Sequence, residues 1–177
     1  MKIVLGPWLV RSLHPDDEEA LARHANNRKI WRNLRDAFPH PYRREDARQF
    51  ITSVTAQTPE TVFAIATPEE AIGAIGFRLQ EDVERISAEI GYWLSEDYWG
   101  QGITTAVLKA VTEYAMGKHD LKRVYAEPFA WNPASFRVLE KAGYVLEGRM
   151  KCSALKDGQV VDQLLYAYTQ DDCQDLF

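Results

Sequence analysis

The sequence has few residues of the kinds that bind metals. It contains two cysteines and four histidines among 177 residues. Neither set follows the spacing of ligands in known metal sites. We therefore expect no metal site, with unpaired thiols and surface imidazoles at Cys152, Cys173, His14, His24, His40 and His119.

Long apolar runs and an excess of basic residues are also absent. The longest apolar runs are a few residues and the N-terminus has no apolar signal core, so we expect a cytoplasmic protein without a membrane span. Lysine and arginine number 21 against 26 aspartates and glutamates, for a net charge of −5. A general nucleic-acid binder would show a basic face, so no direct DNA binding is expected and any RNA contact would be local.

No linker, internal repeat or low-complexity segment divides the chain. Apolar residues make up 46% of the sequence and aromatic residues 11%, which is ordinary for a globular protein with a real core. We expect one domain over residues 1–177, with its core at about 7–170 and an acidic tail at 171–177. Both a monomer and a homodimer are compatible with the sequence.

The stretch Trp99–Thr105, Trp-Gly-Gln-Gly-Ile-Thr-Thr, is the first indication of a specific function. The aromatic and aliphatic segment Ile90–Leu94 precedes it and is typical of a strand. From Ile103 the apolar residues recur at the spacing of a helix that buries one face. The first N–H groups of a helix attract anions, while Gly100 and Gly102 let a phosphate approach the backbone. The order of strand, glycine loop and helix predicts a loop that binds phosphate or pyrophosphate.

A glycine pair alone does not establish a phosphate site, because a connecting loop can use Gly100 and Gly102 for positive φ angles. Two common phosphate motifs are absent. No Lys-Ser or Lys-Thr follows the second glycine, as in a P-loop, and no dinucleotide fingerprint of three glycines is present. The phosphate would therefore belong to a different cofactor.

A second motif runs from Asn132 to Tyr144 and reads Asn-Pro-Ala-Ser-Phe-Arg-Val-Leu-Glu-Lys-Ala-Gly-Tyr. Together with the glycine loop, Ala88–Leu94 and Leu146–Gly148, it resembles the GCN5-related N-acetyltransferase (GNAT) superfamily. The likeness covers nearly the whole chain and is strongest to the branch of the ribosomal-protein-alanine N-acetyltransferases. It departs from the usual loop at Trp99, where Arg or Gln is common, and at Thr104, where Gly or Ala is common. Thr104 still leaves the backbone donors available and adds a hydroxyl.

The resemblance implies that acetyl-CoA is the co-substrate. The loop would bind the pyrophosphate, the preceding strand would pair with the pantetheine arm, and Asn132 would be a ligand of that arm. Arg137 and Lys141 would meet the adenosine phosphates or lie on a solvated face. The candidate coenzyme-binding residues are thus Tyr92, Trp93, Leu94, Gly100, Gln101, Gly102, Ile103, Thr104, Thr105, Asn132, Arg137 and Lys141.

The hydrophobic pattern predicts an α/β protein, and the resemblance implies the single-domain acyl-CoA N-acyltransferase fold. We expect a mixed, mostly antiparallel sheet of seven strands with helices on both faces. A crossover helix would make the strands 84–94 and 122–129 parallel, and a hairpin about Asp157-Gly158 would close the sheet. The other expected strands are 9–13, 62–66, 71–79, 144–155 and 160–169, and helices begin near Pro15, Arg43, Ile103 and Pro133.

The segment 27–42 has a less regular pattern and contains prolines that forbid helix continuation. In the family the first helices and their connection overhang the acceptor site. Aromatic residues at this spacing are, however, more often part of the core. The residues to which these two interpretations apply are Trp31, Leu34, Phe38 and Tyr42.

Acetyl transfer from a thioester needs a neutral amine, a site for the oxyanion and a proton for the leaving thiolate. Glu127 and Glu89 are the candidate bases, because apolar neighbours raise the pKa of a carboxylate, although an ion pair would explain either one without catalysis. A catalytic glutamate occupies the place of Glu127 in some relatives. Ser135 resembles the serine proposed to hydrogen-bond the coenzyme sulfur, or is an ordinary hydroxyl in the first turn of a helix.

Direct attack by the amine is expected, because Cys152 has no evident histidine partner or helix N-terminus to activate it. The leading hypothesis is an acetyl-CoA-dependent N-acetyltransferase acting on a protein N-terminus or a small-molecule amine. An aminoglycoside or polyamine acetyltransferase is an alternative, but it calls for an acidic cluster, whereas Glu69-Glu70 and Glu81-Asp82 fall in expected turns. A domain that binds acetyl-CoA without catalysis is the non-enzymatic alternative.

Overall fold

The computed structural model describes residues 1–170. Contacts divide the chain into two compact units. The first unit comprises Met1–Gly76 and Tyr92–Val107, and the second comprises Phe77–Gly91 and the described residues from Leu108 onward. The expected acidic tail lies outside the described residues.

Within residues 1–170 the structure has eight strands in the order β1-β2-β3-β4-β5-β6-β8-β7. The mixed, mostly antiparallel α/β fold is confirmed, but the expected number of seven strands is wrong. The additional strand is β1 (Lys2–Leu5), which a turn with Gly6 at φ 66° joins to β2 (Trp8–Ser12). A strand of four residues is too short for its alternation to stand out in the sequence.

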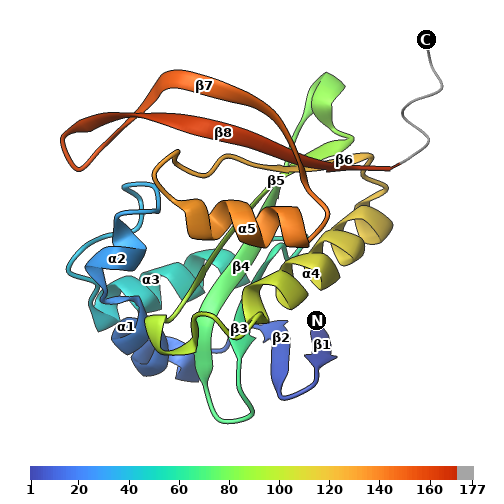
Figure 1. Cartoon of the computed structure of the whole chain (residues 1–177). Coiled ribbons are helices and arrows are strands. Elements are labelled where there is room, and N and C mark those ends of the chain that lie inside the picture. Colours follow the sequence, from blue (N-terminus) through green and yellow to red (C-terminus); the bar gives the residue numbers. More distant parts are fainter. Residues whose placement is uncertain (171–177) are drawn as a thin grey trace. The chain divides into compact units, whose positions relative to one another are not determined.

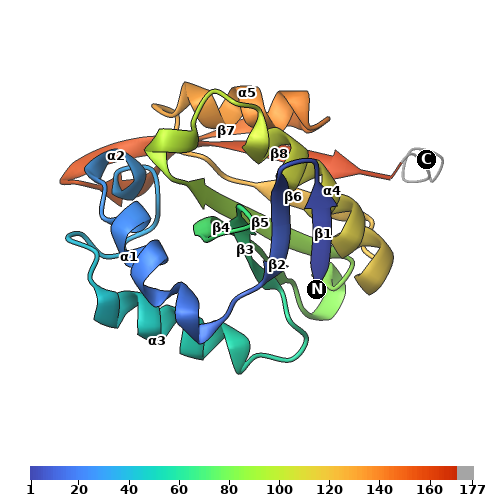
Figure 2. The same cartoon turned by 90° about the horizontal axis from the view of Figure 1, so that it is seen from below.

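In the first unit β2 pairs with β3 (Val62–Ala66), and β3 pairs with the beginning of β4 (Ala71–Leu79). Both β3 and β4 have the predicted bounds. The helices α1 (Glu18–Ala25) and α3 (Arg44–Thr55) lie side by side in Figure 2. A core cluster of this unit contains Leu13, Leu21, Ala25, Tyr42, Ala47, Ile51, Val54, Ala64 and Ala71.

The connection between α1 and α3 contains a helical turn that the sequence did not predict, α2 (Arg28–Trp31). The Asn27 side chain caps it by accepting a hydrogen bond from the backbone N–H of Lys29 at 2.8 Å.

Tyr42, at the end of this connection, is 6% exposed, and its ring centroid lies 4.7 Å from that of Phe38. Burial, with a contribution from Asp46, raises the pKa of Tyr42 to about 12. Tyr42 is therefore a core residue.

In the second unit the first residues of β5 (Ser87–Leu94) pair in parallel with β6 (Arg123–Ala126), as predicted for strands on either side of the helix α4 (Ile103–His119). The strand β6 is shorter than expected, because Pro128 has no N–H to donate. Beyond it Phe129 makes only an isolated antiparallel bridge. The strand β5 likewise begins later than expected, since the residues before it form a 3-10 turn, Asp82–Glu84.

The predicted hairpin is present as β7 (Val145–Lys156) and β8 (Gln159–Thr169). Its turn residues Asp157 and Gly158 have φ angles of 51° and 73°. Figure 1 shows the hairpin as a long ribbon beside the helix α5 (Pro133–Lys141). The Tyr166 hydroxyl of β8 donates to Oε1 of Glu140 in α5 at 3.0 Å.

Gly73 in β4 lies where two backbone segments of the first unit approach closely. A Cβ at this position would lie 2.4 Å from the carbonyl oxygen of Trp93. Gly73→Ala is therefore expected to lower the free energy of unfolding by about 1–3 kcal/mol, as overpacked sites do. Denaturant unfolding measures this change. Gly117→Ala in α4 is the control, because its Cβ would meet nothing within 4 Å, and it should be neutral or stabilising. An equal midpoint for Gly73→Ala and the wild type would contradict the close approach.

Candidate functional site

The glycine loop Trp99–Thr105 has the predicted local structure. It follows β5 and a 3-10 turn, Glu96–Tyr98, and α4 begins at Ile103. Gly100 and Gly102 have φ angles of 76° and 77°, so the positive φ that a connecting loop would also need is present. A Cβ at either glycine would meet nothing within 4 Å, and both residues are exposed. The backbone at the N-terminus of α4 is thus open to a ligand, which fits a phosphate group.

The residues around these glycines fix the ends of the loop. Ile103 is 2% exposed and anchors the first turn of α4 in the core, while Thr104 and Thr105 are half-buried. The Trp99 side chain is 44% exposed, and its indole Nε1 donates to the carbonyl of Leu94 at 2.8 Å. Gln101 is exposed. The loop is therefore anchored at both ends and exposed at its centre.

The end of β5 contributes three predicted coenzyme residues to the same unit. Leu94 is 6% exposed, and Tyr92 and Trp93 are half-buried. The Trp93 ring lies edge-on to Phe38, with the ring centroids 5.7 Å apart. The first unit therefore contains both Tyr92–Leu94 and the glycine loop.

In the second unit the two candidate bases lie near one tyrosine. Glu89 is opposite Tyr125 in the parallel register of β5 and β6, and Glu127 lies two residues beyond Tyr125. Burial raises the pKa of Tyr125, and the negative charges of Glu89 and Glu127 raise it further. Tyr125 was not among the residues predicted from the sequence, although its position two residues before Glu127 places both on one face of an extended segment.

The environments of the two glutamates differ. Glu89 forms an ion pair with Arg78, with Oε2 at 2.6 Å from Nη2. An ion pair of this kind was the non-catalytic explanation that the sequence left open for Glu89. Glu127 is half-buried, and its backbone carbonyl accepts a hydrogen bond from Gln163 at 3.1 Å. The backbone at Glu127 is thereby attached to β8.

The second motif forms the predicted capped helix. The Asn132 side chain accepts a hydrogen bond from the backbone N–H of Ser135 at 3.3 Å, and Pro133 occupies the first turn of α5. Asn132 therefore caps α5 through the backbone N–H of Ser135. Ser135 is half-buried, whereas Arg137 and Lys141 are exposed.

Two histidines contradict the expectation of surface imidazoles. His24 is 9% exposed, and its side chain contacts Ser95 and Glu70. The spacing of His24 from Leu21 and Ala20 on α1 was the available signal, since residues three and four apart share one helix face. His119 is half-buried, and burial, with the charge of Lys118, lowers its pKa. His14 and His40 are exposed as expected.

Cys152 is exposed on β7, and its backbone N–H donates to Oδ1 of Asp162 at 2.7 Å. Asp162 also forms an ion pair with Arg149. Cys173 lies outside the described residues. Over residues 1–170, no cluster of metal-ligating side chains and no helix long and apolar enough to cross a membrane is found.

The match to a family model places this chain in the class of N-acetyltransferases. Residues 8–145 match the acetyltransferase (GNAT) domain, and the chain belongs to this family. The predicted family and the predicted enzyme class, an N-acetyltransferase that uses acetyl-CoA, are thereby confirmed.

Several relatives act on ribosomal proteins. The chain is 35% identical over 106 residues to the ribosomal-protein-serine acetyltransferase of Escherichia coli K12, a match that covers 60% of this chain and 59% of that protein. It is 28% identical over 179 residues to the ribosomal protein uS5-alanine N-acetyltransferase of the same strain, which covers 97% and 92%. A solved ribosomal alpha-N-protein acetyltransferase in complex with coenzyme A has a TM-score of 0.85 at 25% identity, over 97% of this chain and 99% of that one.

Proposed function

We propose that the chain transfers the acetyl group of acetyl-CoA directly to a primary amine, and that the preferred acceptor is the α-amine of a protein N-terminus. The observation that carries the proposal is the open glycine loop at the N-terminus of α4, where Gly100 and Gly102 hold the backbone at positive φ. The serine and alanine acetyltransferases among the relatives support an N-terminal acceptor.

In this proposal the first unit binds the coenzyme. The N–H groups at the start of α4 donate to the pyrophosphate, and the absence of side chains at Gly100 and Gly102 lets the phosphates approach. The backbone of Tyr92–Leu94 pairs with the pantetheine arm. By the resemblance, Asn132, Arg137 and Lys141 are further candidate ligands of the coenzyme, and all three belong to the second unit.

The candidates for the acid–base chemistry are Glu127, Glu89 and Ser135. Glu127 takes the proton that the ammonium must lose before or as the new carbon–nitrogen bond forms. Glu89 is the weaker candidate, because its carboxylate is already paired with Arg78. The Ser135 hydroxyl donates a hydrogen bond to the sulfur as the carbon–sulfur bond breaks and negative charge develops on the thiolate. The nitrogen loses a second proton as the carbon–sulfur bond breaks, and the thiolate gains one proton. The products are an amide, free coenzyme A and the proton that Glu127 releases to solvent.

Two measurements on the wild-type chain test the proposal. Calorimetry with coenzyme A should show binding, and thermal unfolding should shift upward, because a ligand of the native state raises apparent stability. Acetyl-CoA-dependent release of free thiol should occur with peptides that begin with serine or alanine, and not with the same peptides blocked at the N-terminus. Absence of heat and of a thermal shift at saturating coenzyme A would refute the proposed function. Turnover with small amines and not with peptides would show that the acceptor is a small-molecule amine.

A further inference from the structure

A buried polar chain joins α1 to the segment that leads into the glycine loop. His24 Nδ1 lies 2.9 Å from Oγ of Ser95, and His24 Nε2 lies 3.1 Å from Oε1 of Glu70. His24 is 9% exposed and Ser95 is 3% exposed. Ser95 follows β5 directly and precedes the 3-10 turn Glu96–Tyr98, after which the glycine loop begins. This series of polar side chains therefore connects three parts of the first unit that are far apart in sequence.

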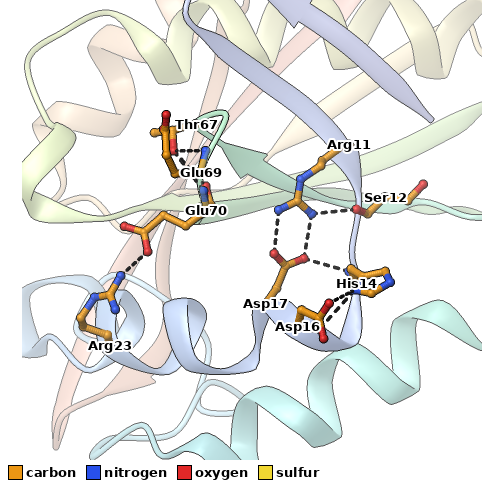
Figure 3. A network of polar contacts seen from close by, with 9 residues as sticks. All are labelled: Arg11, Ser12, His14, Asp16, Asp17, Arg23, Thr67, Glu69 and Glu70. Carbon is orange, nitrogen blue, oxygen red and sulfur yellow. Dashed lines mark hydrogen bonds and ion pairs between the residues drawn. The ribbon is translucent and has the colours of Figure 1, made fainter.

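The Glu70 end of this chain is itself fixed. Figure 3 shows Glu70 directed toward Arg23, with which it forms an ion pair. In the same turn, the Thr67 hydroxyl accepts hydrogen bonds from the backbone N–H groups of Glu69 and Glu70, both at 3.1 Å. Burial opposes the charge of Glu70, but the hydrogen bonds from His24 and Arg23 outweigh it and lower the pKa of this carboxyl group. Thr67 therefore fixes the backbone of Glu70, and Arg23 pairs with its carboxylate.

The charge of Glu70 sets the roles of the two ring nitrogens. Nε2 of His24 lies 3.1 Å from Oε1 of Glu70 and 3.5 Å from Nη2 of Arg23. A carboxylate only accepts hydrogen bonds, so we assign the ring proton to Nε2, which donates it to the nearer Glu70. In the neutral ring Nδ1 is then the acceptor of the Ser95 hydroxyl. A serine, histidine and carboxylate in series also occur in hydrolases. Here the serine is 3% exposed, which leaves its hydroxyl out of reach of a substrate.

Further contacts hold the segment Ser95–Tyr98 in place. The Ser95 N–H donates to the carbonyl of Ile72 at 2.9 Å, and Nδ2 of Asn27 donates to Oε2 of Glu96 at 2.7 Å. The ring of Tyr98 lies edge-on to His24, with the centroids 6.0 Å apart. His24 therefore contacts both Ser95 and Tyr98.

We propose that His24 is a positioning residue, which acts through Ser95 to hold the entry of the glycine loop in its coenzyme-binding conformation before the coenzyme arrives. This inference rests on the proposed function. A loop that is ordered in advance binds more tightly, because the ligand does not have to order it. Glu70, fixed by Thr67 and Arg23, orients the imidazole that in turn orients Ser95.

Two amide substitutions distinguish the hydrogen bond of Nδ1 of His24 from that of Nε2. Asparagine places its amide near the position of Nδ1, whereas glutamine places its amide near the position of Nε2. His24→Asn therefore keeps a partner for Ser95 and loses Glu70, and His24→Gln keeps Glu70 and loses Ser95. We expect His24→Gln to weaken coenzyme A binding about three- to tenfold, the effect of one buried hydrogen bond. His24→Asn should retain affinity within about twofold of the wild type.

Ser95→Ala removes the same hydrogen bond from the serine side, with a smaller change of side chain. It should weaken coenzyme A binding as much as His24→Gln, and the double variant should be no weaker than either one, because both remove one interaction. In steady-state kinetics, KM for acetyl-CoA should rise in His24→Gln and Ser95→Ala while kcat changes little. Hydrogen exchange of the amides at 96–102 in the coenzyme-free protein should be faster in both variants than in the wild type and His24→Asn.

The readouts separate this inference from the proposed function. Failure of the wild type to bind coenzyme A would refute the proposed function, and the exchange measurement would still decide whether His24 holds the loop entry. A lower melting temperature for His24→Gln with unchanged exchange at 96–102 and unchanged affinity would show a structural role only and overturn the inference. Equal affinity in Ser95→Ala and the wild type would also overturn it.

Discussion

Glu127→Gln is expected to lower turnover by on the order of 10²-fold or more, with little change in coenzyme A affinity. Glutamine keeps the shape of the side chain and removes the basic oxygen that would take the proton from the amine. The loss should shrink as pH rises, because a growing share of the amine is then neutral without help. An α-amine has a pKa of about 8 and a lysine amine about 10.4, so the recovery should begin at lower pH for an N-terminal acceptor.

Glu89→Gln is the matched control, since it makes the same chemical change at the register partner of Tyr125. It should cost less turnover, because the Glu89 carboxylate already pairs with Arg78 at 2.6 Å. The measurement is turnover against pH for the wild type and both variants with one acceptor peptide. A near-normal profile for a folded Glu127→Gln would remove Glu127 from catalysis. A larger loss in Glu89→Gln than in Glu127→Gln would make Glu89 the base.

Gly102→Val is expected to weaken coenzyme A binding by about ten- to a hundredfold. Gly102 has a φ of 77°, and a β-branched residue at such an angle is strained by about 1–3 kcal/mol, which the loop can relieve only by leaving its conformation. The new side chain would also occupy the open space at the N-terminus of α4, where the phosphates are proposed to bind. Calorimetry with coenzyme A measures the loss.

Gly6→Val tests whether strain alone produces this effect. Gly6 has a φ of 66° in the turn between β1 and β2, and a Cβ there would also meet nothing within 4 Å. This variant should lose stability through the same backbone strain and keep its affinity for coenzyme A. If both variants bind coenzyme A as the wild type does, the glycine loop is only a connection between β5 and α4.

The structure decides between some of the alternatives that the sequence left open, and leaves others open. At Tyr42 burial favours the core, and at Glu89 the ion pair with Arg78 provides a partner without catalysis. For the loop, both interpretations fit, since Gly100 and Gly102 have positive φ and also leave open space. For Ser135, the cap supplied by Asn132 leaves the proposed role at the sulfur as a prediction.

The sequence by itself determined the features whose signals lie within a few neighbouring residues. The glycine loop before α4, the cap of α5 at Asn132 and the turn at Asp157-Gly158 were predictable, because φ restrictions, missing N–H groups and capping side chains act locally. The bounds of β3 and β4 followed from their apolar composition and flanking turns. The short strand β1 carried too few residues for such a signal.

Only the tertiary structure decided which distant side chains meet. His24 and Ser95 are 71 residues apart in the chain, and His24 and Glu70 are 46 apart. His24 was expected at the surface, and its spacing from Leu21 on α1 could have indicated a buried position but not its partners. Burying an imidazole requires hydrogen bonds that only the packing of other elements supplies. The same reason applies to Tyr125 and Glu89, which became neighbours when β5 and β6 paired in parallel.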